Sequence, residues 1–135
     1  MLAACGGGER AVRFTDVTRQ LHGFEPPRLT RVLLSSQAEL ESYFRHESPG
    51  TITRLPHVDW SKRELIVIAA GPRSSTGYIL RVLGVRETPN TITVTVHEVT
   101  PHLGQPVRAR VTYPYRVITI PRIHKKLFVH WPGRP

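Results

Sequence analysis

The sequence of 135 residues contains a single cysteine, Cys5, which excludes an internal disulfide and any metal site built on several thiolates. It also lacks an apolar stretch of about 18 residues, the length that a membrane-spanning helix requires. No internal repeat and no low-complexity tract is visible. The composition, with 39% apolar and 21% charged residues, is that of an ordinary globular chain with one core.

Acidic residues are scarce as well: 10 stand against 19 lysines and arginines, which gives a net charge of +9. Such a balance favours contact with an anionic surface, whether nucleic acid, lipid headgroups or an acidic protein. The basic residues are spread along the chain, and Lys125 and Lys126 form the only lysine pair. This distribution favours a generally basic solvated surface over a specific site for nucleic acid.

The N-terminus carries a short motif around the one cysteine. "LAACGGG", residues 2–8, has the pattern of a bacterial lipobox in which Cys5 is lipidated, followed by a flexible glycine tether. Only Met1 precedes it, so a charged and apolar leader is missing. We expect residues 1–10 to be a truncated lipobox with its tether and residues 11–135 to form a single domain. On this interpretation the protein is an extracytoplasmic, membrane-anchored lipoprotein; the alternative is a cytoplasmic protein with a small-residue tail.

The apolar pattern predicts an α+β domain of mostly antiparallel strands, arranged as a curved sheet or as a sandwich or barrel. One amphipathic helix is expected over residues 36–47, with Ser36 and Glu39 as its capping box. The run "ELIVIAA" predicts a central strand covered on both faces. Six or seven strands are expected, over residues 11–19, 29–36, 64–70, 77–87, 91–99, 107–120 and 125–131.

The segment "GPRSSTGYIL", residues 71–80, concentrates glycine, arginine and hydroxyl side chains between two of these strands. It does not match a phosphate-binding loop, because Thr76 and Gly77 stand where a glycine and a lysine are required. It does not match a nucleophile elbow, because Gly71 lies too early for Ser74 or Ser75. The segment therefore predicts a turn between strands. The alternative left open is that Arg73 and its neighbours bind a carboxylate or another anion.

Two further clusters contain side chains of types that can carry chemistry. His97, Glu98 and His102 do not form a zinc motif, because successive strand residues point to opposite faces. Arg108 and Arg110 are expected on one face of a strand, either as a solvated edge or as a protein contact. No catalytic residue, metal or cofactor is expected. The candidates for partner or anion binding are Arg73, Ser74, Ser75, Thr76, Tyr78, Glu98, Arg108 and Arg110.

The order of these motifs over residues 59–121 resembles the C-terminal domain of the PrcB protease-complex subunit family. The shared pattern is an Asp–aromatic pair, an apolar strand, G-x-[KR]-x-T-G-G-Y, a strand ending in E-x-x-P, and a Pro–Tyr strand closing in I-P. Thr76 departs from this pattern, since a glycine is usual there. The matching positions are Asp59, Trp60, Gly71, Arg73, Gly77, Tyr78, Glu98, Pro101, Tyr113, Pro114, Tyr115, Ile120 and Pro121.

The resemblance implies a non-catalytic bacterial envelope domain, named for a lipoprotein that associates with a secreted protease and helps to maintain it. Two functional hypotheses follow. The first is an envelope-associated accessory module that binds a protein partner and assists or stabilises a secreted protease complex, and it agrees with the separate interpretation of Cys5. The second is a cytoplasmic basic module that binds nucleic acid or a small anion through Arg73, Arg108 and Arg110.

Overall fold

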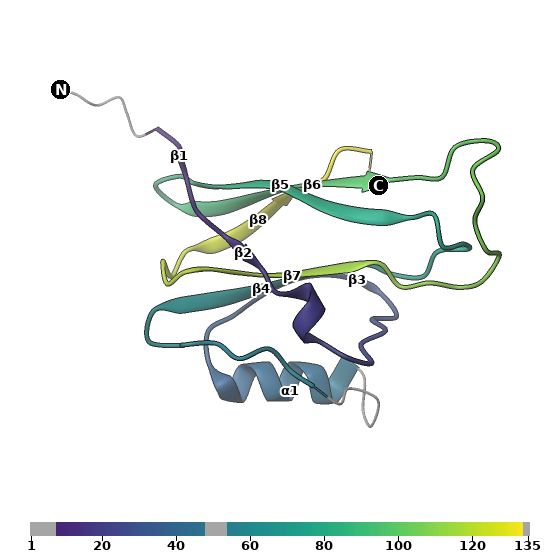
Figure 1. Cartoon of the computed structure of the whole chain (residues 1–135). Coiled ribbons are helices and arrows are strands. Elements are labelled where there is room, and N and C mark those ends of the chain that lie inside the picture. The colour runs from purple at the N-terminus through teal and green to yellow at the C-terminus, as the bar shows by residue number, and fades with distance from the viewer. Residues whose placement is uncertain (1–7, 48–53, 134–135) are drawn as a thin grey trace.

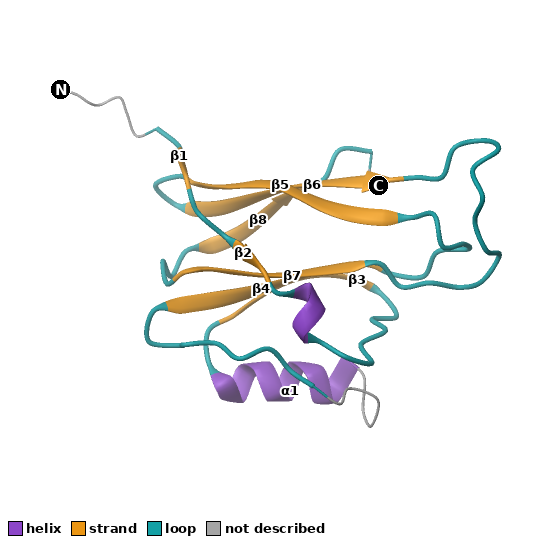
Figure 2. Cartoon of the chain, viewed as in Figure 1, coloured by secondary structure: helices purple, strands orange, loops and turns teal. Residues whose placement is uncertain are grey.

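The computed structural model describes residues 8–47 and 54–133, and within them the chain forms eight strands and one α-helix (Figures 1 and 2). Cys5, and with it the predicted lipobox, lies outside the described residues. The elements are β1 (Arg10–Ala11), β2 (Thr15–Asp16), a 3-10 turn (Thr18–Gln20), β3 (Leu29–Leu34), α1 (Gln37–Glu47), β4 (Arg63–Ala70), β5 (Ile79–Glu87), β6 (Thr91–Val99), β7 (Tyr115–Pro121) and β8 (Lys126–His130).

The strands form two four-stranded sheets that pack face to face. The outer sheet has the order β1-β5-β6-β8, and the central sheet has the order β2-β7-β4-β3. Every pair of neighbours is antiparallel except β6 and β8, which are parallel. Helix α1 covers the free face of the central sheet, so the molecule has three layers (Figure 1). The predicted α+β class is confirmed, and the sheets form an open sandwich, not a closed barrel.

Strand β4 lies at the centre of the molecule because neither of its faces is polar. Its alternate residues Ile66, Ile68 and Ala70 contribute to the core between the two sheets. Leu65 and Val67 point the other way, into the core beneath α1. All five side chains are at most 1% exposed. The expectation of a central strand covered on both faces is confirmed.

Helix α1 begins close to its predicted position. The Ser36 hydroxyl accepts a hydrogen bond from the Glu39 N–H at 3.1 Å, as an N-cap does. In a standard capping box the Glu39 carboxylate would accept a hydrogen bond from the N–H of the N-cap residue, Ser36. Here it accepts from the N–H of the preceding residue, Ser35, at 2.9 Å. Leu40 and Phe44 are buried on the face that packs against the central sheet.

The predicted strand over residues 11–19 is wrong as a single element. The chain pairs with β5 through β1, and it then crosses to the central sheet and pairs with β7 through β2. Val12 and Phe14, between these two short strands, pack against the core between the sheets. A strand cannot stay in one ladder while it moves between two sheets, so the alternating pattern here marks a crossing segment.

The predicted strand over residues 107–120 is also wrong in its first half. β7 begins only at Tyr115, and residues 107–114 form a loop with one isolated bridge between Thr112 and Arg73. Pro114 has no N–H to continue a ladder, although its carbonyl still accepts from Ala70 at 3.0 Å. Arg108 and Arg110 therefore do not lie on one face of a strand, contrary to the sequence-based expectation.

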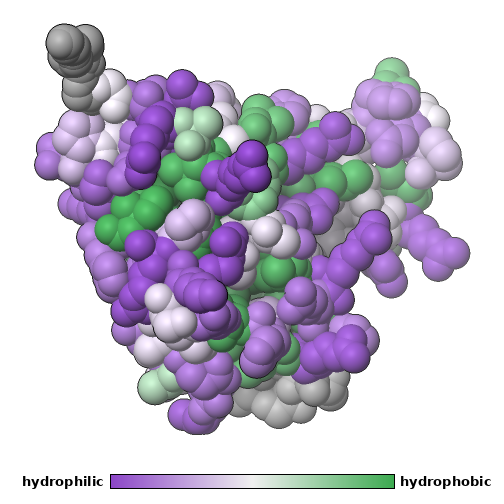
Figure 3. All heavy atoms as spheres, turned by 60° about the vertical axis from the view of Figure 1, so that its left-hand side comes forward, coloured by the Kyte–Doolittle hydropathy of each residue, from purple (hydrophilic) through white to green (hydrophobic). Residues whose placement is uncertain are grey.

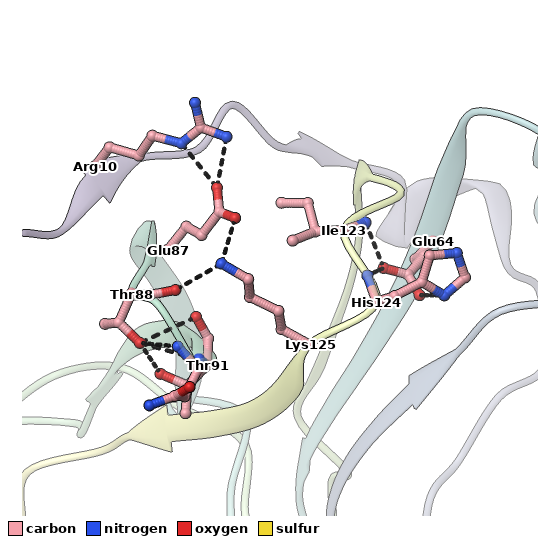
Figure 4. Close-up of polar contacts among 9 residues, drawn as sticks. Arg10, Glu64, Glu87, Thr88, Thr91, Ile123, His124 and Lys125 are labelled. Atoms are coloured by element: carbon pink, nitrogen blue, oxygen red, sulfur yellow. Dashed lines mark hydrogen bonds and ion pairs between the residues drawn. The ribbon is translucent and has the colours of Figure 1, made fainter. Parts of the chain in front are cut away.

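The carboxylate of Glu64, 1% exposed, joins three separate segments, and Figure 4 shows its contacts with Ile123 and His124. One oxygen accepts hydrogen bonds from the N–H groups of Ile123 and His124 at 3.0 and 3.2 Å. The other accepts from the hydroxyl of Ser35 at 2.8 Å. Burial acts to raise the pKa of Glu64, but these hydrogen bonds outweigh it and hold the pKa below its ordinary value. The charged form of Glu64 thus pins the β7–β8 turn to the start of β4.

A second carboxylate, Glu87, secures β1 at the same end of the sandwich (Figure 4). Its oxygens pair with Arg10 at 2.7 Å and with Lys125 at 2.8 Å. Lys125 also donates to the carbonyl of Thr88 at 2.8 Å. These contacts lower the pKa of Glu87, with the hydrogen bond from Lys125 as the main cause. Strand β1 has only two residues, so few backbone hydrogen bonds attach it to β5. The ion pair between Arg10 and Glu87 attaches it further.

We expect Glu64→Gln to weaken the acid sensitivity of the fold. Since folding lowers the pKa of Glu64, its carboxylate stabilises the fold above the ordinary value of about 4.3, and this contribution is lost as the pH falls through the lower folded pKa. The variant should lose about 1 kcal/mol at neutral pH and should show a smaller drop in Tm between about pH 5 and pH 3. Thermal unfolding monitored by circular dichroism measures both effects. Glu41→Gln, on the exposed face of α1, is the control, and an unchanged acid-induced drop in Glu64→Gln would contradict the assignment.

Candidate protein-interaction site

Two connections lie side by side at the end of the sandwich opposite the β5–β6 turn (Figure 1). Residues 71–78 join β4 to β5, and residues 100–114 join β6 to β7; together we call them the loop pair. Arg73 and Thr112 exchange both backbone hydrogen bonds, at 2.8 and 2.9 Å. The N–H of Thr76 donates to the carbonyl of Arg108 at 3.1 Å, and the Thr76 hydroxyl accepts from the N–H of Arg108 at 2.9 Å. The two loops thus form one hydrogen-bonded unit.

The hydroxyl groups of the first loop are used inside the loop pair. Ser75 is 9% exposed, and its hydroxyl accepts from the N–H of Gly77 at 3.4 Å. The carbonyl of Ser75 accepts from the hydroxyl of Thr112 at 2.8 Å. Ser74 is the exposed member of the group. These contacts hold a turn between two strands, which is what the failure of both catalytic motifs predicted.

Arg73 points inward, where it forms a two-pronged ion pair with Glu98. Its Nε and Nη2 atoms lie 2.6 and 2.9 Å from the two carboxylate oxygens. Nη1 donates to the carbonyls of Ala70 and Pro72, and the guanidinium lies over the ring of Tyr78 at 5.9 Å. The side chains of Arg73 and Glu98 are only 15% and 13% exposed.

This geometry gives Arg73, Glu98 and Tyr78 a supporting position in the loop pair. The hydrogen bonds with Glu98 are the main cause that raises the pKa of Arg73 above its ordinary value, against the opposing effect of burial. A guanidinium with this many internal partners has little left to offer an external anion. Binding of a partner by Arg73, expected as one alternative, stays a prediction that the geometry does not favour.

Gly77 is required by the close approach of the second loop. A Cβ atom at this position would lie 2.6 Å from Cβ of Pro101 and 2.8 Å from Cγ1 of Val107. Gly71 is required for another reason, since its φ of 81° lies in the left-handed region. Glu98 and Pro101, three residues apart, thus contact Arg73 and Gly77 respectively. The G-x-R and E-x-x-P elements of the sequence meet in space.

Arg108 and Arg110 differ from Arg73 because both are exposed. Neither forms an ion pair with any acidic residue within residues 8–47 and 54–133. They line an open hollow of about 470 Å³ together with Thr76, Pro106 and Val107. The structure therefore brings three of the predicted site residues, Thr76, Arg108 and Arg110, to one hollow.

Sequence reasoning missed the apolar residues of the second loop. Leu103 is fully exposed, and Val107 and Val111 are 39% and 59% exposed. The signal was present in "HLGQP", where Leu103 stands among polar, glycine and proline residues with no strand or helix periodicity to bury it. An isolated exposed leucine is ordinary, but three exposed apolar side chains on one loop beside two free arginines form a more distinctive surface.

The histidines give no sign of a metal site. His97 is exposed on β6, while its neighbour Glu98 is engaged by Arg73, so these side chains do not converge with His102. In the described part of the chain no group of three or more potential ligands could hold a metal ion. Nor does any helix there have the length and apolar character needed to cross a membrane.

A double-mutant cycle on Arg73 and Glu98 measures the ion pair. We expect Arg73→Gln and Glu98→Gln each to lower the free energy of unfolding by about 2–4 kcal/mol, because each leaves the other charge largely buried and unpaired. The double variant should lose less than the sum, with a coupling of about 1–3 kcal/mol. Urea unfolding provides the values, and Arg108→Gln, an exposed arginine of the same loop pair, should change stability by less than about 0.5 kcal/mol. Independent, additive losses would show that the pair does not support the loops.

Gly77→Ala should destabilise the protein by about 1–3 kcal/mol, because the added methyl group overlaps Pro101 and Val107. Gly84→Ala is the matched control, since a Cβ atom there meets nothing within 4 Å and its φ is not positive. The two midpoints of urea unfolding give the comparison. Equal stability of both variants would mean that the loops do not pack as closely as described.

Comparison with known proteins tests the resemblance directly. No curated protein and no solved structure matches the chain. A protein-family model described as PrcB C-terminal matches residues 65–121, a span that includes the loop pair, most of β4 and all of β5, β6 and β7. Asp59 and Trp60, which also carried the resemblance, precede the matched span. The resemblance to the PrcB C-terminal family is thereby confirmed over residues 65–121.

Proposed function

We propose that the chain is a non-catalytic accessory domain that binds a protein partner in a protease complex and is held at the bacterial envelope by a lipid on Cys5. The observation that carries the proposal is the fully exposed Leu103, presented on a loop that the family's own motif residues hold in place. The match to the PrcB C-terminal family supports the link to a protease complex. The lipobox pattern supports the anchor.

The loop pair has the properties of a preformed docking surface. Its backbone is tied by the paired hydrogen bonds between Arg73 and Thr112 and by those between Thr76 and Arg108. A loop that is already ordered loses less entropy on binding than a loose one. Exposed apolar side chains next to arginine are typical of the residues that contribute most to protein–protein affinity.

Other parts of the surface are less suited to this role. On the side that β1 and β2 cross, apolar side chains reach the surface only in areas divided by polar ones (Figure 3). The free face of the outer sheet exposes Leu83 and Phe128 at 63% and 56%, but Arg81 and His97 lie opposite each other on the same sheet. The loop pair is the place where apolar exposure coincides with the segment that defines the family.

A supporting role fits the loop chemistry better than catalysis does. The hydroxyls of Ser75 and Thr76 accept hydrogen bonds from loop N–H groups, and Glu98 is neutralised by Arg73. Nucleophilic catalysis requires a hydroxyl or thiol within hydrogen-bond reach of a base. No such pair occurs among the described residues of the loop pair. This absence supports an accessory domain.

One observation favours a second function, a basic module for nucleic acid or small anions. The net charge is +9, and Arg108 and Arg110 are without an acidic partner in the described part of the chain. Such a module would lose affinity steeply as salt rises, because binding releases condensed counterions.

Leu103→Asp should disrupt partner binding without disturbing the fold. The lipidated full-length protein, isolated from its native envelope, should bring down a protease subunit, and the variant should recover about a tenth as much or less, because a charge replaces the exposed anchor. Quantitative mass spectrometry of the co-isolated proteins measures the loss.

Leu83→Asp is the matched control, since Leu83 is also exposed but lies on the outer sheet away from the loop pair. It should recover as much of the subunit as the wild type, and both variants should keep the wild-type Tm. Recovery of no peptidase with the wild-type protein would overturn the proposed function. Equal loss in both leucine variants would overturn the loop pair as the contact site.

A further inference from the structure

The hollow beside Arg108 and Arg110 has a rigid frame. Both backbone groups of Arg108 are engaged, the N–H by the hydroxyl of Thr76 and the carbonyl by the N–H groups of Thr76 and Arg110. Pro106, with its restricted backbone, and Val107 form the apolar part of the lining. Val107 in turn packs close to Gly77, which fixes its position relative to the first loop. The two arginine side chains therefore project from a defined backbone.

The charge of the hollow is uncompensated. Two other arginines near this end have acidic partners: Arg73 pairs with Glu98, and Arg116 lies 3.5 Å from Asp16. Glu25 lines the adjoining hollow together with Arg110, but it forms no ion pair with that arginine within 4.0 Å. An exposed pair of unpaired guanidinium groups attracts carboxylates, which arginine binds through two parallel hydrogen bonds.

We propose that this hollow binds an acidic segment of the partner protein, with a carboxylate on Arg108 and Arg110 and a neighbouring apolar side chain against Pro106 and Val107. The inference rests on the proposed function, because it names the chemistry of the partner that the loop pair receives. Thr76 contributes here through its hydroxyl, which holds the Arg108 backbone. A glycine at this position, the usual residue of the family pattern, has no side chain to form that contact.

An acidic protein segment fits the hollow better than nucleic acid or a second copy of this chain. The lining contains no aromatic ring on which a base could stack, and two of its five residues, Pro106 and Val107, are apolar. A second copy would bring another net charge of +9 to a surface that is already basic. A peptide that combines Glu or Asp with Leu or Val satisfies both parts of the lining.

The test uses a labelled short peptide in which Glu and Asp stand next to Leu and Val, titrated with the full chain by fluorescence anisotropy at near-physiological salt. Arg108→Glu/Arg110→Glu should weaken binding at least about tenfold, because two charge-assisted contacts become repulsive. Arg13→Glu/Arg81→Glu has the same net charge, and its exposed arginines do not line the hollow, so it should bind within about twofold of wild type. A peptide with Gln and Asn in place of Glu and Asp should bind at least about tenfold more weakly than the acidic peptide.

Several outcomes would overturn the inference. Failure of the acidic peptide to bind the wild type would do so, as would equal weakening by the two arginine double variants, since that would indicate a general charge effect. Tighter binding of oligothymidylate through Arg108 and Arg110 would replace the acidic partner with nucleic acid. Arg108→Gln/Arg110→Gln, which removes charge without reversing it, serves as the second variant if the reversal alters the Tm.

The same variants separate this inference from the proposed function. If the arginine-reversed protein still co-isolates the protease subunit as the wild type does, the acidic contact is wrong and the accessory function stands. If the wild type co-isolates no peptidase but binds the acidic peptide through these arginines, the hollow is an acidic-peptide site and the protease-complex function is wrong.

Discussion

The burial of both faces of β4 is the constraint on which the rest of the structure depends. A strand with apolar side chains on both sides needs a cover on each, and here the outer sheet supplies one and α1 supplies the other. Each fully buried Val, Leu or Ile side chain contributes about 1.5–3 kcal/mol, so the four on β4, Leu65, Ile66, Val67 and Ile68, make this strand the main link between the two cores. Glu64 at its start and Gly71 after its end then determine where the strand's neighbours turn.

The loop after β4 depends on this placement. Because β4 is immobilised at the centre, Gly71 and Arg73 emerge at a defined point, and Arg73 meets Glu98 from β6 in the other sheet. The ion pair and the contact of Gly77 with Pro101 join the two sheets at one end of the sandwich. These contacts explain the spacing of Glu98 and Pro101. Glu98 neutralises the inward Arg73, and Pro101 packs against Gly77, where there is no room for a Cβ atom. The G-x-R and E-x-x-P elements of this sequence therefore hold the two loops together.

The sequence was informative where a local pattern coincides with burial, and it failed where tertiary contacts decide. Continuous apolarity predicted the central position of β4, strict alternation predicted the inward face of β6, and the capping residues predicted the start of α1. Alternation at Val12 and Phe14 suggested a strand, but two sheets compete for that segment. Arg73 was expected in a turn and Arg108 on a strand, and neither expectation indicated which guanidinium is buried; the position of Glu98 decides that in favour of Arg73. Leu103 was overlooked because periodicity describes what a core will bury, not what a loop exposes.

The arginines of the loop pair differ in role: Arg73 stabilises the loops, and Arg108 and Arg110 are exposed for contact. The guanidinium of Arg73 is engaged by Glu98 and is therefore not free to bind a partner. The side chains of Arg108 and Arg110 stay free, because backbone contacts with Thr76 and between the two arginines order this part of the loop. Substitutions at Arg108 or Arg110 therefore change the exposed surface with little effect on folding, whereas changes at Arg73 or Glu98 destabilise the fold. The inward pair and the Gly77–Pro101 contact therefore support the loops independently of the Arg108 and Arg110 side chains.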